Sequence, residues 1–254
     1  TTFIQTDNMN FTRAQRYLLS LCSGILLSIS FPFAGSITPL VFIGFVPLLF
    51  LSEDLQTKSK GGWHLFLQTY IAFLIFNLGT TWWVANSSFV GALLAFVFNT
   101  LFMSVTFVLF HIVKKGLRFN WAIWTLIPLW ISFEYFHFNW DLSWPWLTLG
   151  NFFSIRATWI QWYEYTGTFG GSLWILIVNI LFFNLINAYF KEQKFSFRKI
   201  ITVGLWIFIP LLFSFYLFQN YSIKGIQKEV IFYTTSQHDN SGLLVFEQET
   251  RLVS

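Results

Sequence analysis

Charged side chains are scarce in this chain of 254 residues: Asp, Glu, Lys and Arg together make up 10% of it, whereas hydrophobic residues make up 55%. A soluble domain carries about 25% charged residues, so the surface of this protein cannot face water on all sides. The composition therefore predicts an integral membrane protein. The net charge of +4 does not indicate nucleic-acid binding, because the basic residues are spread through the loops and form no continuous basic run.

Cysteine is almost absent, since Cys22 is the single one, and this excludes an intrachain disulfide. A nucleophilic thiol needs a nearby base or cation, and Cys22 lies in an apolar segment without such a neighbour. We interpret it as a small buried apolar residue. The sequence also has no zinc-ligand spacing, no phosphate-binding glycine loop and no G-x-S-x-G motif, so we expect neither a metal nor a cofactor.

Long apolar runs are what the chain has instead. A helix that crosses a bilayer needs about 20 mostly apolar residues. Seven candidate spans are present: 17–33, 37–52, 63–84, 89–113, 120–138, 167–190 and 199–220. They predict an all-α polytopic membrane protein with about seven transmembrane helices, divided into a polar N-terminus 1–16, a transmembrane domain 17–221 and a tail 222–254.

The first two runs are short and closely spaced. Pro32 and Pro39 flank a tight turn, which predicts a helical hairpin. A cleaved signal peptide is the alternative, because Arg13 and Arg16 precede the first run and Ala34-Gly35 is similar to a cleavage site. The second apolar run follows almost at once, which favours the hairpin.

Basic residues follow a strict alternation along the chain. They stand before the first run and after the second, fourth and sixth: Arg13, Arg16, Lys58, Lys60, Lys114, Lys115, Arg118, Lys191, Lys194, Arg198 and Lys199. The loops after the first, third and fifth runs hold Arg156 alone. Because Lys and Arg are retained in cytoplasmic loops, we expect the N-terminus to be cytoplasmic and residues after 221 to be extracytoplasmic.

Tryptophan gathers on the side that this alternation assigns to the exterior. The set is Trp82, Trp83, Trp140, Trp144, Trp146, Trp159 and Trp162. An aromatic belt at the lipid headgroups explains most of them. Five of the seven lie in the single loop 139–166, so we expect this loop to lie in the outer interface as short amphipathic segments and to contact acyl chains or a lipidated substrate.

A few polar residues interrupt the apolar runs. Glu134 and His137 are three residues apart in the fifth run and can share one helix face. Such a carboxylate either contacts a substrate or headgroup or forms a structural pair that locks helix packing, and both interpretations stay open. We expect the amides in the spans to bond between helices; they are Asn77, Asn99, Asn179, Asn184 and Asn187.

Several stretches resemble the membrane domain of apolipoprotein N-acyltransferase, and together they cover about residues 17–221. The similar stretches are Ser30-Phe-Pro-Phe-Ala-Gly35, Phe45-Val-Pro-Leu-Leu-Phe50, Trp82-Trp83, the run from Glu134 through Trp144-Pro-Trp-Leu-Thr-Leu-Gly-Asn151, Tyr165-Thr-Gly-Thr-Phe-Gly-Gly171, and Leu173 to Asn179. The chain departs from the family pattern at His137, where Arg is frequent, and at Trp144, where Phe is usual.

The resemblance implies an acyltransferase of the bacterial cytoplasmic (inner) membrane, which moves an acyl chain from a phospholipid donor to the N-terminal amine of a diacylated lipoprotein acceptor. In that family a Glu-Lys-Cys triad acts through a thioester, in a nitrilase-like domain between the seventh and eighth spans. Residues 222–254 contain no cysteine, so no catalytic residue is assigned and we expect this chain alone to be inactive. For substrate and lipid binding the resemblance and the loop composition point to Glu134, His137, Trp140, Trp144 and Trp146.

The tail reads as a strand at 229–235, a polar turn and a strand at 243–247, which we interpret as the truncated start of a nitrilase-like domain. Two other functions remain as alternatives. A small transporter would need a polar path at the midplane and paired broken helices, and the third possibility is a non-catalytic membrane scaffold.

Overall fold

The structure is a computed structural model that describes residues 10–56, 58, 61–117, 119, 121–141, 143–194, 196–221, 233–236 and 245–248. The chain divides into two units, Thr1–Gln219 and Asn220–Ser254. Lys60, Arg118, residues 1–9 of the polar N-terminus and most of the tail lie outside the described residues.

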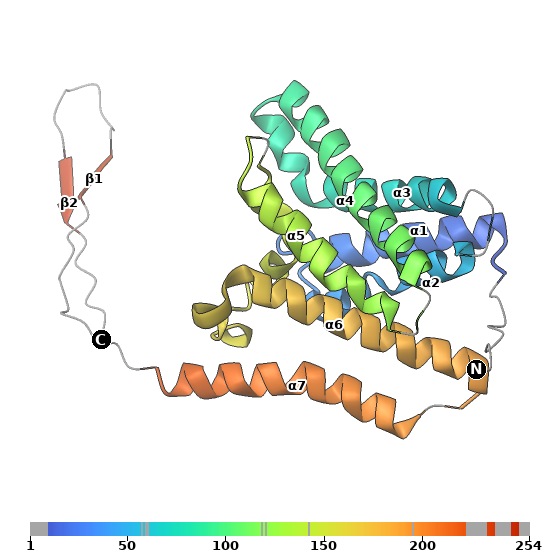
Figure 1. Cartoon of the computed structure of the whole chain (residues 1–254). Coiled ribbons are helices and arrows are strands. Elements are labelled where there is room, and N and C mark those ends of the chain that lie inside the picture. The colour runs from blue at the N-terminus through green and yellow to red at the C-terminus, as the bar shows by residue number, and fades with distance from the viewer. Residues whose placement is uncertain are drawn as a thin grey trace. The chain divides into compact units, whose positions relative to one another are not determined.

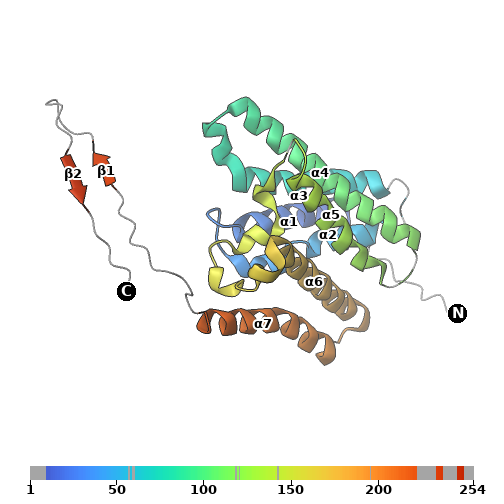
Figure 2. The same ribbon diagram turned by 60° about the vertical axis from the view of Figure 1, so that its left-hand side comes forward.

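Every regular element among the described residues of the first unit is a helix (Figures 1 and 2). Its α-helices are α1 (Arg13–Ser30), α2 (Val46–Leu55), α3 (Gly61–Thr81), α4 (Phe89–Leu117), α5 (Leu126–Phe138), α6 (Tyr163–Glu192) and α7 (Phe197–Gln219). Six 3-10 helices connect them: η1 (Thr38–Ile43), η2 (Trp82–Asn86), η3 (Ala122–Thr125), η4 (Pro145–Leu147), η5 (Leu149–Phe153) and η6 (Ala157–Trp159). The prediction of an all-α polytopic membrane protein with about seven helices is confirmed.

Five segments of the described residues are long and apolar enough to cross a membrane, judged by length and composition: Thr38–Leu55, Gly61–Asn86, Phe89–Leu117, Tyr163–Glu192 and Phe197–Gln219. α1 and α5 are not among them. The 13 residues of α5 extend for about 20 Å at 1.5 Å per residue, which is less than the hydrocarbon thickness of about 30 Å. The fifth predicted span is thus a short helix preceded by the 3-10 turn η3.

The second predicted span is a broken helix in which η1 passes into α2 at Gly44 and Phe45. Asn179 of α6 bonds to the backbone at this break: its Oδ1 accepts from Phe45 N at 2.8 Å, and its Nδ2 donates to Val41 O at 2.8 Å. Non-helical backbone at membrane depth is tolerated where protein groups satisfy it. The amide therefore bridges two helical segments, as the sequence predicted for asparagines in the spans.

α1 and α3 pack closely through small residues. A side chain on Gly24 would meet the backbone of Ala72 and the side chain of Ile75, and Ser28 Oγ donates to Ile75 O at 3.2 Å. Glycine at this position lets the two backbones approach each other, which is the usual way for membrane helices to associate. On the same helix Cys22 is partly exposed rather than buried.

Four fully buried rings form the centre of the unit. Phe45 at the break meets Phe73 of α3, Phe107 of α4 and Trp130 of α5, with ring centroids 4.9–6.3 Å apart. Aromatic pairs at this separation contribute beyond their buried area. This contact ties α2, α3, α4 and α5 into one core.

α7 is the most exposed helix of the candidate spans, with 11% of its apolar window buried, and it runs alongside α6 (Figures 1 and 2). Trp174 Nε1 of α6 donates to Trp206 O at 2.6 Å. Near the other end, Ser214 Oγ accepts from Gln161 N at 2.6 Å and donates to Thr158 O at 2.9 Å. Two polar contacts therefore attach a helix that is otherwise covered by few protein groups.

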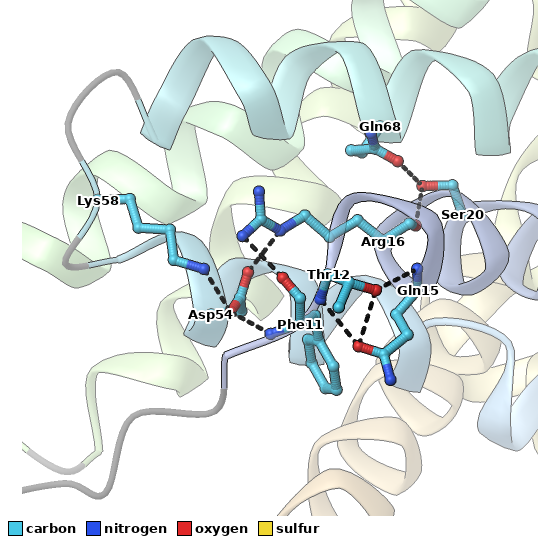
Figure 3. Close-up of polar contacts among 8 residues, drawn as sticks. All are labelled: Phe11, Thr12, Gln15, Arg16, Ser20, Asp54, Lys58 and Gln68. Carbon is cyan, nitrogen blue, oxygen red and sulfur yellow. Dashed lines mark hydrogen bonds and ion pairs between the residues drawn. The ribbon is translucent and has the colours of Figure 1, made fainter.

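The acidic end of α2 collects basic residues from other segments, in what we name the Asp54 cluster (Figure 3). The Asp54 side chain is 0% exposed and accepts from Arg16 Nε at 2.8 Å, from Lys58 Nζ at 2.7 Å and from Phe11 N at 3.0 Å. Beside it, Glu53 pairs with Lys114 Nζ at 2.6 Å. Basic residues that flank three different loops thus lie at one end of the helices, in agreement with the alternation in the sequence.

In the second unit, β1 (Tyr233–Ser236) and β2 (Val245–Gln248) pair antiparallel, with Tyr233 opposite Gln248. The two strands overlap those predicted at 229–235 and 243–247. The remaining predicted strand residues and the turn between them lie outside the described residues.

Candidate functional site

The loop between α5 and α6 carries most of the predicted site, and its middle is part of the protein core. Phe152 stacks on Phe76 of α3 at 5.6 Å, and Phe153 stacks on Trp174 of α6 at 4.9 Å. The loop consists of the short helices η4, η5 and η6, as expected from its amphipathic segments. The part around residues 147–153 is mostly buried in protein, so the surface open to lipid is confined to the parts on either side.

Glu134 fastens this loop to α5. Glu134 is 3% exposed, and its Oε1 accepts hydrogen bonds from Leu149 N at 2.8 Å and from Trp130 Nε1 at 3.0 Å. Two hydrogen bonds from the protein give Oε1 a structural use, whereas Oε2 is buried without a hydrogen-bond partner among the described residues. The adjoining residue Gly150 donates its N–H to Ser172 Oγ at 3.0 Å, so both α5 and α6 hold the loop at this point.

Gly150 is required by close packing in the same place. A side chain there would run into the backbone of Thr168, and the Gly150 carbonyl accepts from the Tyr163 hydroxyl at 2.9 Å. Gly167, which the sequence places at the entry of the sixth span, has φ +62° and kinks the first turns of α6. Glycine adopts this conformation without strain, so the kink turns Tyr163 and Thr168 toward the loop.

His137 belongs to a different hydrogen-bonded chain from Glu134. Trp140 Nε1 donates to His137 Nδ1 at 3.1 Å, and His137 Nε2 lies 3.0 Å from Asn99 Oδ1. Because Nδ1 accepts, Nε2 carries the proton and donates to Asn99. Asn99 Nδ2 in turn donates to Asn77 Oδ1 at 2.6 Å. The chain links α5, α4 and α3, and within the described residues Glu134 and His137 are not bonded to each other.

Trp146 lines a cavity that we name the aromatic cavity. It has a volume of about 490 Å³ and lies between the turn after α1, the end of α3 with η2, and the loop. The lining residues are Phe31, Pro32, Phe33, Ala34, Gly79, Thr80, Thr81, Trp82, Trp83, Trp146, Asn151 and Ser154.

The rings of Trp146 and Trp83 meet edge to face at 5.8 Å, and Trp146 is 55% exposed. Asn151 Nδ2 donates to Pro145 O at 2.9 Å and to Trp146 O at 3.1 Å, which fixes the backbone that carries this indole. Cavities of several hundred Å³ with apolar walls and a few polar groups are typical of small-molecule and lipid sites.

Trp144 and His137 line a second cavity of about 310 Å³, between α4 and the residues after α5, which we name the α4 cleft. Glu134, His137 and Trp144 are among the residues that line a further cavity of about 10 Å³, which has room for about one water molecule.

The structure thus separates the five predicted site residues into two groups. His137 and Trp144 line the α4 cleft, Trp140 bonds to His137, and Glu134 is buried beside them, whereas Trp146 lines the aromatic cavity. Phe31, Phe33 and the pair Trp82-Trp83 were not among the predicted site residues. The available signal was topological, because the predicted spans put the ends of the first and third runs on the same side as the loop.

Cofactor-binding groups are few. Within the residues that the structure describes, no three His, Cys, Asp or Glu side chains are close enough to hold a metal ion. The two cavities are lined by aromatic and aliphatic side chains, by amide and hydroxyl groups and by the exposed carboxylate of Asp141.

Comparison with known proteins gives consistent results. Residues 23–181 match the family described as the apolipoprotein N-acyltransferase N-terminal domain. An apolipoprotein N-acyltransferase of Chlorobaculum tepidum is 32% identical over 218 residues, which are 84% of this chain and 40% of that protein. The corresponding protein of Geobacter metallireducens is 24% identical over 210 residues, 78% of this chain and 39% of that protein. No solved structure matches.

The chain spans about 40% of the length of these curated relatives. The family match covers more than half of the chain, including α3, α4, α5, the loop with η4 to η6 and the first half of α6. This multi-pass membrane chain therefore belongs to the apolipoprotein N-acyltransferase family, whose N-terminal domain it contains.

Proposed function

We propose that this chain is the membrane part of an enzyme that transfers an acyl chain from a phospholipid to the N-terminal amine of diacylglyceryl-cysteine on a lipoprotein, in the bacterial cytoplasmic membrane. The observation that carries the proposal is the aromatic cavity, which lies within the part of the chain that matches the family. Its role is to hold lipid substrate, with Trp83 and Trp146 as the main contacts.

The chemistry of acyl transfer explains why such a cavity is needed. An acyl-enzyme thioester forms and is consumed in two steps, and each step requires a membrane lipid to be held with its ester or amine outside the hydrocarbon. Indole rings suit this depth, because they have an apolar body and a polar N–H. The protein backbone around Trp146 is fixed by Asn151, so the rings are held in place before lipid arrives.

The division of the chain follows from the same proposal. Residues 1–16 form a cytoplasmic N-terminus, residues 17–221 the transmembrane domain, and residues 222–254 an extracytoplasmic tail that begins a nitrilase-like domain. The aromatic cavity is then on the extracytoplasmic side, which is also the side proposed for the residues after 221. The Glu-Lys-Cys triad is not assigned to any residue of this chain, and the chain alone binds lipid without transferring acyl groups.

Lipid binding by the aromatic cavity can be measured on the chain purified in nonionic micelles. Native mass spectrometry reports the fraction of chain that retains phosphatidylglycerol. We expect Trp83→Ala and Trp146→Ala each to weaken retention about fivefold, because each removes an aromatic wall of the cavity. Trp63→Ala is the matched control, since Trp63 is exposed on α3 and lines none of this cavity.

Equal retention by both cavity variants and the unchanged chain would contradict the assignment of this cavity. The absence of acyl transfer is tested separately, by incubating the chain with labelled phospholipid and a diacylated lipopeptide. We expect no triacylated product, and its formation by this chain would overturn that part of the proposal.

A further inference from the structure

α7 contains a proline in its interior, at Pro210. Proline has no backbone N–H, so the carbonyl four residues earlier, which is that of Trp206, loses its partner within the helix. A backbone carbonyl at membrane depth costs free energy unless another group bonds to it, and prolines are tolerated in membrane helices where a neighbouring segment supplies that group. The helix therefore needs a donor from outside at this point.

Trp174 of α6 supplies this donor. Its Nε1 donates to Trp206 O at 2.6 Å. Trp174 is 3% exposed, and its indole stacks on Phe153 at 4.9 Å and meets Phe42 edge to face at 4.9 Å. The donor is thus held by the surroundings of α6, whereas the acceptor is available because residue 210 is a proline.

The contact lies on one narrow face of α7. From residue 203 onward, the positions of this helix that are not exposed recur at helical spacing: Val203, Gly204, Ile207, Pro210, Leu211, Ser214 and Leu217. Lipid is as apolar as most of these side chains, so their burial contributes little to the association of the two helices. Hydrogen bonds therefore carry a large part of the attachment of α7.

A second polar contact follows one turn after Pro210. Ser214 is 0% exposed; its Oγ accepts from Gln161 N at 2.6 Å and donates to Thr158 O at 2.9 Å. Thr158 belongs to η6, in the loop between α5 and α6. The two contacts stand on either side of Pro210 and end on different segments, so together they define the position of α7 along α6.

We propose that Pro210 is the positioning residue that sets the place of α7 on the transmembrane domain. By removing one helical hydrogen bond it presents the Trp206 carbonyl to Trp174. With this contact made, α7 has one position along α6, in which Ser214 reaches the loop and holds its last part. The proposal concerns the packing of α7 and stands whether or not the aromatic cavity binds lipid.

A double-mutant cycle tests whether the proline provides the acceptor. In Pro210→Ala the new N–H bonds to Trp206 O within the helix, so this carbonyl no longer depends on Trp174. Trp174→Phe keeps an aromatic ring but removes the donor. We expect Trp174→Phe to raise the unfolding equilibrium constant about fivefold more in the unchanged chain than in the Pro210→Ala background, the scale of one hydrogen bond.

Equilibrium unfolding in mixed micelles with SDS measures the four chains of the cycle. The loss of ring volume is the same in both backgrounds and cancels in the cycle. Pro128→Ala is the matched control, because Pro128 is an exposed proline in the first turn of α5, and we expect it to leave the effect of Trp174→Phe unchanged. An equal effect of Trp174→Phe with and without Pro210, or an equal reduction by Pro128→Ala, would overturn the proposal.

A distance measurement tests the position of α7 directly. With Cys22→Ser as background, spin labels at Ala157→Cys in η6 and Leu212→Cys on α7 occupy two exposed positions, and double electron–electron resonance reports their separation. We expect one narrow distance distribution in the chain with Pro210. In Pro210→Ala we expect a shifted or broader distribution, because the contact that fixes α7 has lost its acceptor.

Gly204→Ala on the same helix is the control for this measurement, since nothing lies within 4 Å of the added carbon, and we expect it to keep the narrow distribution. The same distribution in the unchanged chain and in Pro210→Ala would overturn the positioning role of the proline. This measurement does not require the Trp174 variant to fold, and Pro210→Ala itself favours the helix.

Discussion

The carboxylate of Glu134 joins α5 to the loop that follows it. Its Oε1 accepts from Leu149 N and Trp130 Nε1, and the residue is buried. Two residues after Leu149, Asn151 fixes the backbone of Trp146. The position of the aromatic cavity wall therefore depends on a side chain of α5 that does not line that cavity.

Two substitutions of Glu134 distinguish the contribution of its oxygen acceptor to stability from that of its negative charge. Glu134→Ala leaves two buried donors unpaired, and we expect it to lower the free energy of unfolding by about 3 kcal/mol. Glu134→Gln keeps an oxygen acceptor, and we expect it to retain most of the stability. Thermal unfolding in micelles, followed by circular dichroism, measures both. A Gln variant as unstable as the Ala variant would show that the negative charge itself is required.

At the scale of elements, the contact between α1 and α3 depends on a missing side chain. Gly24→Ala places a methyl group against the Ala72 backbone and Ile75 and pushes α1 and α3 apart. We expect this variant to lose about 2 kcal/mol of the free energy of unfolding. Gly204→Ala on α7 is the matched control, because nothing lies within 4 Å of the added carbon. There we expect no loss, since alanine favours a helix over glycine. Equal melting temperatures of the two variants would argue against tight packing at Gly24.

The elements also show what could be predicted from the sequence. Apolar runs of about 20 residues identified α3, α4, α7 and the part of α6 after Gly167, because each is one continuous helix. The break in the second run was not predicted, since it depends on Asn179, 134 residues beyond Phe45. The shortness of α5 was also not predicted. The apolar residues of η3 and α5 form one run in the sequence, although the first segment is a 3-10 helix and the second an α-helix.

For the site, local sequence was less informative than for the fold. The aromatic loop was predicted to contact lipid, but the burial of Phe152 and Phe153 depends on α3 and α6. The aromatic cavity arises where three segments distant in sequence meet and the α4 cleft where two meet, so residue type alone could not divide Trp144 from Trp146. The spacing of Glu134 and His137 indicated that they can share a helix face. In the structure, Glu134 accepts a hydrogen bond from Leu149 N and His137 bonds to Asn99.

At the scale of the whole molecule, the orientation in the membrane can be measured in intact cells. With Cys22→Ser as background, we expect Ser143→Cys to react with a membrane-impermeant maleimide added outside. We expect Lys115→Cys to react only after the cells are permeabilised, because its loop is on the basic side. Labelling of the Lys115 variant from outside, with protection of the Ser143 variant, would invert the topology and remove the proposed function with it.

Two basic residues of the Asp54 cluster, Arg16 and Lys58, have one role during insertion and another in the folded protein. In the orientation that we propose, Arg16 and Lys58 keep their segments in the cytoplasm while the polypeptide is being inserted. Once α1 and α2 have come together, the same two residues become counter-ions of a carboxylate that is closed off from water. In that orientation we expect replacement of either residue to disturb two stages of biogenesis, first the direction in which the hairpin enters the bilayer and later the closing of its cytoplasmic end.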